Sequence, residues 1–86
     1  MKIINQDKTA IFSLDNCNVF CVEEVVYITQ GINVYDGKAA ILGHYENKEE
    51  AEDVLWDLFV KIKEKDIFYE MPQIGELLEE ELGNEF

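Results

Sequence analysis

The chain of 86 residues carries 19 acidic side chains against 7 lysines and no arginine, which gives a formal net charge of −12 at pH 7. This balance argues against a direct hold on a nucleic-acid backbone or an anionic membrane, because both need clustered basic groups, and it suits a basic partner. Hydrophobic residues make up 48% of the chain and aromatic residues 12%, which argues against a disordered chain and predicts one domain over residues 1–86.

Residues 1–45 are predicted to form mainly strands and turns, because short runs of β-branched and aromatic residues alternate there with turn-forming residues. Asp36-Gly37 lies between two apolar runs and predicts a two-residue hairpin turn, since both turn positions need positive φ. The pattern predicts a small antiparallel sheet of about four to six strands. In chain order, the expected strands are residues 2–5, 9–14, 19–22, 25–29, 32–35 and 39–45.

An amphipathic helix is predicted over residues 48–65. Asn47 is a suitable N-cap, and Glu50, three residues on, is a suitable capping-box partner. Acidic residues in the first turns and lysines in the last turn both favour the helix dipole. Apolar residues recur at helical spacing and predict one stripe that packs on the sheet: Ala51, Val54, Leu55, Leu58, Phe59 and Ile62.

After this helix, residues 67–71 are predicted to form a strand that returns to the sheet and ends at Pro72. Residues 74–82 are expected to form a short C-terminal helix, with Gly83 suited to its C-cap. The fold class that follows is α+β, with residues 1–45 mainly strands and residues 46–86 mainly helical and strongly acidic.

The excess negative charge is concentrated in the second half of the chain. Residues 1–45 carry three lysines and five acids, whereas residues 46–86 carry four lysines and fourteen acids. Like charges at i, i+4 on a helix cost roughly 0.2–0.5 kcal/mol per pair, so an acidic face suggests binding of a basic partner around Trp56 as an anchor. The candidate partner-binding residues are Glu49, Glu52, Asp53, Trp56, Asp57, Glu76, Glu79 and Glu80.

Two alternatives to this interpretation stay open. The acids can serve solubility alone, and Trp56 can be covered by the second helix or the tail. A structural or assembly protein acting as a homodimer would also use antiparallel edge strands and an exposed tryptophan. The chain is therefore expected to be either a monomer or a homodimer.

The sequence offers little for metal binding or catalysis. Cys17 and Cys21 with His44 are the candidates for a small zinc-binding module, although structural zinc usually takes four ligands, often in two cysteine pairs. A single histidine and no glycine-rich phosphate loop predict a protein that is not an enzyme and needs no cofactor. No long apolar segment suggests a membrane span or a signal peptide, so a cytoplasmic location with reduced thiols is expected.

Four segments resemble a group of small proteins encoded by phages and mobile elements of Gram-positive bacteria: MKIINQDKT (1–9), ILGHY (41–45), EEAEDVL (49–55) and IFYEMP (67–72). The resemblance covers about residues 1–9 and 41–72. It implies a phage accessory protein acting in the host cytoplasm. Small acidic proteins of this kind include inhibitors of host defence, with anti-CRISPR proteins as the leading example. The resemblance thus implies a nucleic-acid mimic that binds the basic channel of a CRISPR effector nuclease.

Overall fold

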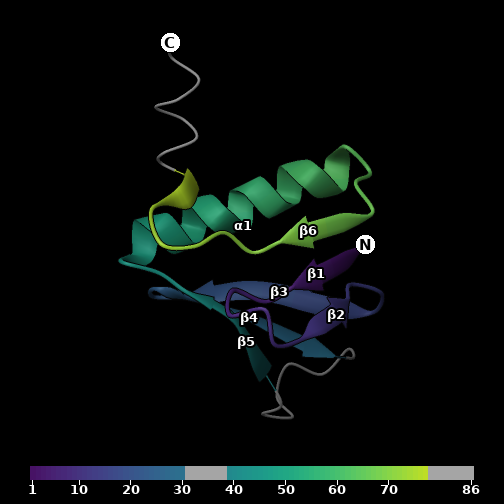
Figure 1. Cartoon of the computed structure of the whole chain (residues 1–86), viewed down its shortest axis with the longest axis horizontal. Coiled ribbons are helices and arrows are strands. Elements are labelled where there is room, and N and C mark those ends of the chain that lie inside the picture. Colours follow the sequence, from purple (N-terminus) through teal and green to yellow (C-terminus); the bar gives the residue numbers. More distant parts are fainter. Residues whose placement is uncertain (31–38, 78–86) are drawn as a thin grey trace.

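The computed structural model describes residues 1–30 and 39–77, and it confirms the α+β class. The described residues form two three-stranded sheets and one helix, shown in Figure 1. No helix in these two segments is long and apolar enough to span a membrane. The elements in chain order are β1 (Lys2–Ile4), β2 (Ile11–Ser13), β3 (Cys17–Val22), β4 (Val25–Gln30), β5 (Ala39–His44), α1 (Lys48–Lys63) and β6 (Phe68–Glu70).

The expectation of one antiparallel sheet is wrong, because the strands divide between two sheets. Their orders are β2–β1–β6 and β3–β4–β5. The first sheet is mixed: β1 pairs antiparallel with β2 and parallel with β6, with Ile3 opposite Tyr69. Between β2 and β3 the chain turns at Asn16, which has a φ of 58°, and Cys17 N–H donates to the Leu14 carbonyl at 3.1 Å. This turn directs β3 into a separate sheet.

Every described strand differs from its expected range by one or two residues at one or both ends, and for β2 the cause is local. β2 begins at Ile11 because the backbone N–H groups of Thr9 and Ala10 both donate to Asn5 Oδ1, at 2.9 and 3.0 Å, instead of joining the sheet. β3 begins two residues early, at Cys17, and β6 is shorter than residues 67–71. β5 pairs with β4, whereas the predicted 32–35 strand and its Asp36-Gly37 turn lie outside the described residues.

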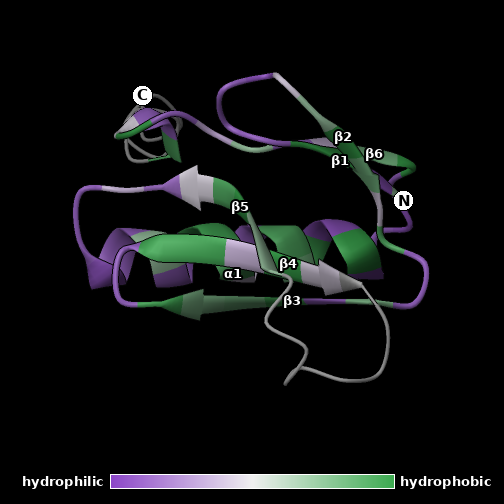
Figure 2. Ribbon diagram, turned by 90° about the horizontal axis from the view of Figure 1, so that it is seen from below, coloured by the Kyte–Doolittle hydropathy of each residue, from purple (hydrophilic) through white to green (hydrophobic). Residues whose placement is uncertain are grey.

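The core lies between α1 and one face of the β3–β4–β5 sheet, an arrangement visible in Figure 2. Val26 and Ile28 of β4 and Leu42 of β5 point to the helix and are at most 2% exposed. From α1, Ala51, Val54 and Leu58 complete this layer. At one side of it the β2–β1–β6 sheet contributes Ile3 and Tyr69, so both sheets share a single hydrophobic cluster.

The predicted helical stripe is correct only in part, because Phe59 and Ile62 are 46% and 43% exposed. Phe59 is turned about 100° from the buried Leu58 around the helix axis and therefore lies beside the stripe. Ile62 lies in the last turn, over an open groove of about 540 Å³ that Met1 and Ile67 also line. The end of α1 consequently overhangs the core instead of closing it.

Both ends of α1 follow from local hydrogen bonds. Asn47 caps the first turn as predicted, since its Oδ1 accepts from Glu50 N–H at 2.8 Å. The helix ends at Lys63 and not at residue 65, because Lys65 adopts a φ of 62°. Lys65 N–H then donates to the Ile62 carbonyl and Asp66 N–H to the Lys61 carbonyl, the pair of bonds that defines a Schellman motif.

The predicted C-terminal helix over residues 74–82 is not confirmed. Residues 74–75 form a turn, with Glu76 N–H donating to the Gln73 carbonyl at 3.0 Å, and helical backbone is present only at residues 76–77, where the described residues end. The remainder of that prediction lies outside the described residues.

A hydrogen-bond network joins the two sheets at Pro72. The Pro72 carbonyl accepts from Tyr45 Oη at 2.9 Å and from Gln6 Nε2 at 3.3 Å. Gln6 Oε1 in turn accepts from His44 N–H at 2.8 Å. Burial, and after it the nearby carboxylates of Glu50 and Glu76, raises the pKa of Tyr45 well above its ordinary value, so its hydroxyl remains a donor at physiological pH.

Replacing Gly43 by alanine is expected to lower the free energy of unfolding by about 1–3 kcal/mol, the usual cost of overpacking a core. A Cβ on Gly43 would lie 2.7 Å from Tyr45 Oη and 2.9 Å from Cε2 of the same ring. The ring is 1% exposed and held by Pro72, so it cannot move away cheaply. Urea unfolding of Gly43→Ala measures the loss. On a Tyr45→Phe background, which lacks the nearest atom, the same substitution should cost less, and an equal cost would contradict this explanation.

Candidate interaction surface

The face of α1 that points away from the core carries the acids and the tryptophan that the sequence singles out. Glu49, Glu52 and Asp53 are exposed, and Trp56 is 66% exposed. They share a face because positions three, four and seven residues apart lie on one side of a helix. Within residues 1–30 and 39–77, the carboxylates of Glu49 and Asp53 make no hydrogen bond or ion pair, whereas Glu52 lies 3.9 Å from Lys48 Nζ.

Trp56 is not covered by any described residue, and it forms an exposed aromatic patch with Phe59. The two ring centroids are 5.1 Å apart, with the planes inclined by 31°. Lys63 Nζ lies 5.7 Å from the centroid of the Phe59 ring, on the side toward the end of the helix. This Trp56–Phe59 patch therefore has carboxylates on its N-terminal side and a lysine on its C-terminal side.

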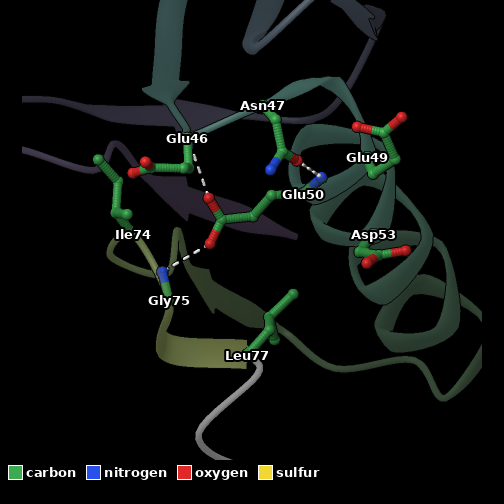
Figure 3. Close-up of a pocket in the computed structure, with 8 residues that line it drawn as sticks. All are labelled: Glu46, Asn47, Glu49, Glu50, Asp53, Ile74, Gly75 and Leu77. Atoms are coloured by element: carbon green, nitrogen blue, oxygen red, sulfur yellow. Dashed lines mark hydrogen bonds between the residues drawn. The ribbon is translucent and has the colours of Figure 1, made fainter.

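Beside the first turns of α1 lies an open pocket of about 410 Å³, drawn in Figure 3. One wall is acidic, from the loop before the helix and the helix itself, and Ile74 and Leu77 form the apolar wall opposite. We call this the acidic pocket. It is lined by Glu46, Asn47, Glu49, Glu50, Asp53, Ile74, Gly75 and Leu77.

Glu50 holds the acidic pocket together. Its Oε1 accepts from Glu46 N–H at 2.8 Å, and its Oε2 accepts from Gly75 N–H at 2.5 Å, as the dashed lines in Figure 3 show. In the predicted capping box, the Glu50 carboxylate would accept from the N–H of the N-cap, Asn47. It accepts instead from the N–H of Glu46, one residue earlier. Gly75 has a φ of 79°, a conformation that glycine adopts without strain. One carboxylate therefore ties residues 73–77 to the helix start.

Two predicted partner-binding residues have intramolecular roles. Asp57 is half-buried, and its Oδ2 accepts from Tyr69 Oη at 2.7 Å, which connects α1 to β6. Glu76 Oε2 accepts from Gln73 N–H at 2.7 Å. Glu79 and Glu80 lie outside the described residues. Of the predicted set, the structure therefore brings Glu49, Glu52, Asp53 and Trp56 together on one open surface.

Sequence reasoning missed the parts of this surface that depend on tertiary packing. Apolar spacing places Phe59 in the core stripe, although its position three residues after Trp56 is also the spacing of a neighbouring pair on a helix. Ile74 and Leu77 fall within the predicted helix over residues 74–82, and their role as a wall of the acidic pocket has no signal in the local sequence.

The described residues contain no group of three or more potential ligands that could hold a metal ion. Cys17 and Cys21 lie four residues apart on β3, which separates their Cα atoms by about 13 Å. That spacing is too long for two thiolates on one zinc ion, whose Zn–S bonds measure about 2.3 Å. Cys17 Sγ instead donates to the Ser13 carbonyl at 3.0 Å. The geometry therefore argues against the zinc module formed with His44.

Comparison of the chain with protein-family models, with curated proteins and with solved structures found no match.

Proposed function

We propose that this protein binds a basic protein surface through the outward face of α1, and that it is a phage-encoded inhibitor of host defence, of the anti-CRISPR kind. The binding mode rests on the geometry of α1, and the biological role rests on the resemblance of four sequence segments to small phage proteins. The single observation that carries the binding mode is an exposed Trp56 beside the carboxylates of Glu49 and Asp53, which have no partner among residues 1–30 and 39–77.

Both components of this surface suit a positively charged partner. A few residues carry most of the binding energy at a protein interface, and buried tryptophans and arginines are prominent among them. A guanidinium or ammonium group over the face of a tryptophan is also attracted by the ring electrons. Carboxylates around such an anchor speed the encounter and fix its orientation. The charge of −12 adds long-range attraction to the same partner.

The spacing of the carboxylates supports competition with nucleic acid. Glu49, Glu52 and Asp53 span five residues of helix, a rise of about 6 Å, which is roughly one charge per 3 Å. A nucleic-acid strand presents about one phosphate per 3.4 Å along its axis. A channel that holds a guide–target duplex by its backbone would therefore meet a similar charge density on α1.

The proposal is tested by adding the purified protein to guide-loaded CRISPR effector nucleases of several types and measuring cleavage of target DNA. We expect inhibition of one type. We also expect the dissociation constant for that effector to rise at least about tenfold between 50 and 300 mM NaCl, because exposed charges are screened.

Two results would separate the parts of the proposal. Binding that does not change with salt would overturn the electrostatic mode on α1. A lack of binding to every effector, together with salt-sensitive capture of another basic protein, would overturn the anti-CRISPR role and leave the binding mode standing.

A further inference from the structure

The outer side of β3 carries backbone groups that no described strand pairs with. β3 lies at one edge of the β3–β4–β5 sheet, on the side away from the β2–β1–β6 sheet, as Figure 2 shows. Val22 and Val25 flank the turn that joins β3 to β4, so this pair exchanges both of its hydrogen bonds. The pattern alternates along an antiparallel pair, and the N–H and C=O groups of Val19 and Cys21 therefore point outward. Within the described part of the chain, none of these outward groups has a hydrogen-bond partner.

Among the described strands, β3 is the long edge that stays open. The opposite edge of its sheet is occupied, since the Leu42 carbonyl accepts from Gln6 N–H at 2.7 Å and His44 N–H donates to Gln6 Oε1 at 2.8 Å. The edge strands of the other sheet, β2 and β6, have three residues each. β3 has six residues, all at least partly exposed, and it contains no proline, no charged residue and no bulge against β4. It therefore lacks the devices that usually prevent an edge from pairing.

The side of α1 above this edge is apolar in its middle turns. Asp57 faces the β2–β1–β6 sheet, because its carboxylate accepts from Tyr69 of β6. Phe59 comes two residues later, about 200° around the helix axis, and therefore lies on the opposite side, toward β3. Leu55 lies about one turn before Phe59 on the same side, and the Trp56 and Phe59 ring centroids are 5.1 Å apart. A chain that pairs with β3 would thus run beside Leu55 and the Trp56–Phe59 patch.

We infer that this edge of β3 binds an extended segment of a partner protein, which adds a fourth strand to the β3–β4–β5 sheet. The outward N–H and C=O groups of Val19 and Cys21 repeat every second residue, or about every 6.8 Å. The backbone of an extended chain presents complementary groups at the same spacing, so hydrogen bonding itself specifies the kind of occupant. Main-chain pairing accepts many sequences, and the neighbouring side chains set the preference among them.

The surroundings of β3 specify which side chains the added strand carries. Cys21 lies opposite the buried Val26, so its side chain points to α1, and the residues paired beside it would point the same way. Those residues would meet Leu55 and Phe59, which favours apolar side chains at these alternate positions. The intervening residues point away from α1, where the net charge of −12 favours lysine or arginine. The expected occupant is therefore a segment in which apolar and basic residues alternate.

The inference goes beyond the proposed function, and the two fail separately. The carboxylates of Glu49 and Asp53 carry the proposed function, and main-chain pairing with β3 does not use them. A neutral substitution at Cys21 changes neither the charge of α1 nor the net charge. Loss of the strand contact would consequently leave the α1 binding mode standing, and the open edge of β3 does not depend on which partner α1 binds.

Amide hydrogen exchange, measured by NMR on the full chain, tests whether the edge is open and whether it binds a strand. In the free protein, the amides of Val19 and Cys21 should exchange at least about a hundredfold faster than that of Phe20, whose N–H bonds to Tyr27 of β4. The binding probe is a synthetic heptapeptide of alternating lysine and valine, blocked at both ends. At saturation, it should slow the exchange of Val19 and Cys21 at least about tenfold, because their N–H groups become bonded.

Cys21→Pro removes one outward N–H and keeps the hydrogen bonds to β4, since proline is tolerated on an edge strand where its nitrogen faces solvent. The dissociation constant for the heptapeptide should rise at least about tenfold, because a carbonyl of the peptide loses its donor. Cys21→Ala is the matched control: it removes the same thiol but keeps the N–H, and it should change the dissociation constant less than about threefold. Circular dichroism checks that both variants fold.

Four outcomes would overturn the inference: exchange of Val19 and Cys21 as slow as that of Phe20 in the free protein, no binding of the heptapeptide at 1 mM, binding that leaves the two amides unprotected, or equal weakening by Cys21→Pro and Cys21→Ala. Protection that appears without peptide and grows with protein concentration would also overturn it, by assigning the edge to a second copy of the chain. Should Cys21→Pro unfold, the exchange measurements on the wild-type protein decide.

Discussion

The double charge reversal Glu49→Lys/Asp53→Lys is expected to weaken binding to the basic partner about 100-fold, equivalent to about 2.7 kcal/mol. Both carboxylates lie on the outward face of α1, and neither has a partner within the described part of the chain. Lysines at these positions remove two attractive contacts and place like charges opposite the partner's basic groups, which costs several kcal/mol at an interface. The dissociation constant for the effector identified by the inhibition assay measures the effect.

A second reversal with the same change in net charge is the control. Asp15→Lys/Glu23→Lys alters two exposed residues that lie outside α1, in the β2–β3 and β3–β4 turns. Both double variants raise the net charge by four units, from −12 to −8. The control should change affinity less than about threefold, mainly through the association rate. Equal weakening by both would show that total charge, and not the face of α1, governs binding.

Trp56→Ala is expected to weaken the same binding about 30-fold, which corresponds to about 2 kcal/mol and is the usual loss at an aromatic anchor. The free energy of unfolding should change by less than about 0.5 kcal/mol, because the side chain is 66% exposed and contributes little to the core. Binding measurements and urea unfolding of one preparation provide both values.

Ile67→Ala is the matched control for Trp56→Ala, because Ile67 is 83% exposed and lies outside α1. Its affinity should equal that of the wild type. A Trp56→Ala variant that binds normally would remove Trp56 from the interface. A large loss of stability in that variant would instead assign Trp56 a structural role.

The start of α1 could be predicted from sequence because its determinants are local. Asn47 and Glu50 are three residues apart and form the cap that their spacing predicts. The end of the helix could not be predicted so closely, since Lys65 adopts a conformation that usually selects glycine. Short-range rules describe which residues favour the left-handed position that ends a helix, and here lysine occupies a position that glycine favours.

The division into two sheets could not be predicted from periodicity. Ile3 pairs with Tyr69, 66 positions along the chain, and an alternating pattern in either segment does not reveal its partner. The candidate site, too, could be predicted from sequence only in part. Helical spacing placed Glu49, Asp53 and Trp56 on one face, whereas the engagement of Asp57 depends on Tyr69, which only the folded chain brings near.

The pairing of β1 with β6 also has a consequence for folding during translation. The β3–β4–β5 sheet and α1 are complete once residue 63 has left the ribosome, but β1 lacks one neighbour until residues 68–70 emerge. Synthesis from β1 to β6 takes roughly 3–13 s at about 5–20 residues per second. For that time, one backbone edge of the first strand stays open. Unpaired strand edges are templates for contact with other chains. The nascent protein is therefore most exposed to misassembly at its first strand, until its last described strand arrives.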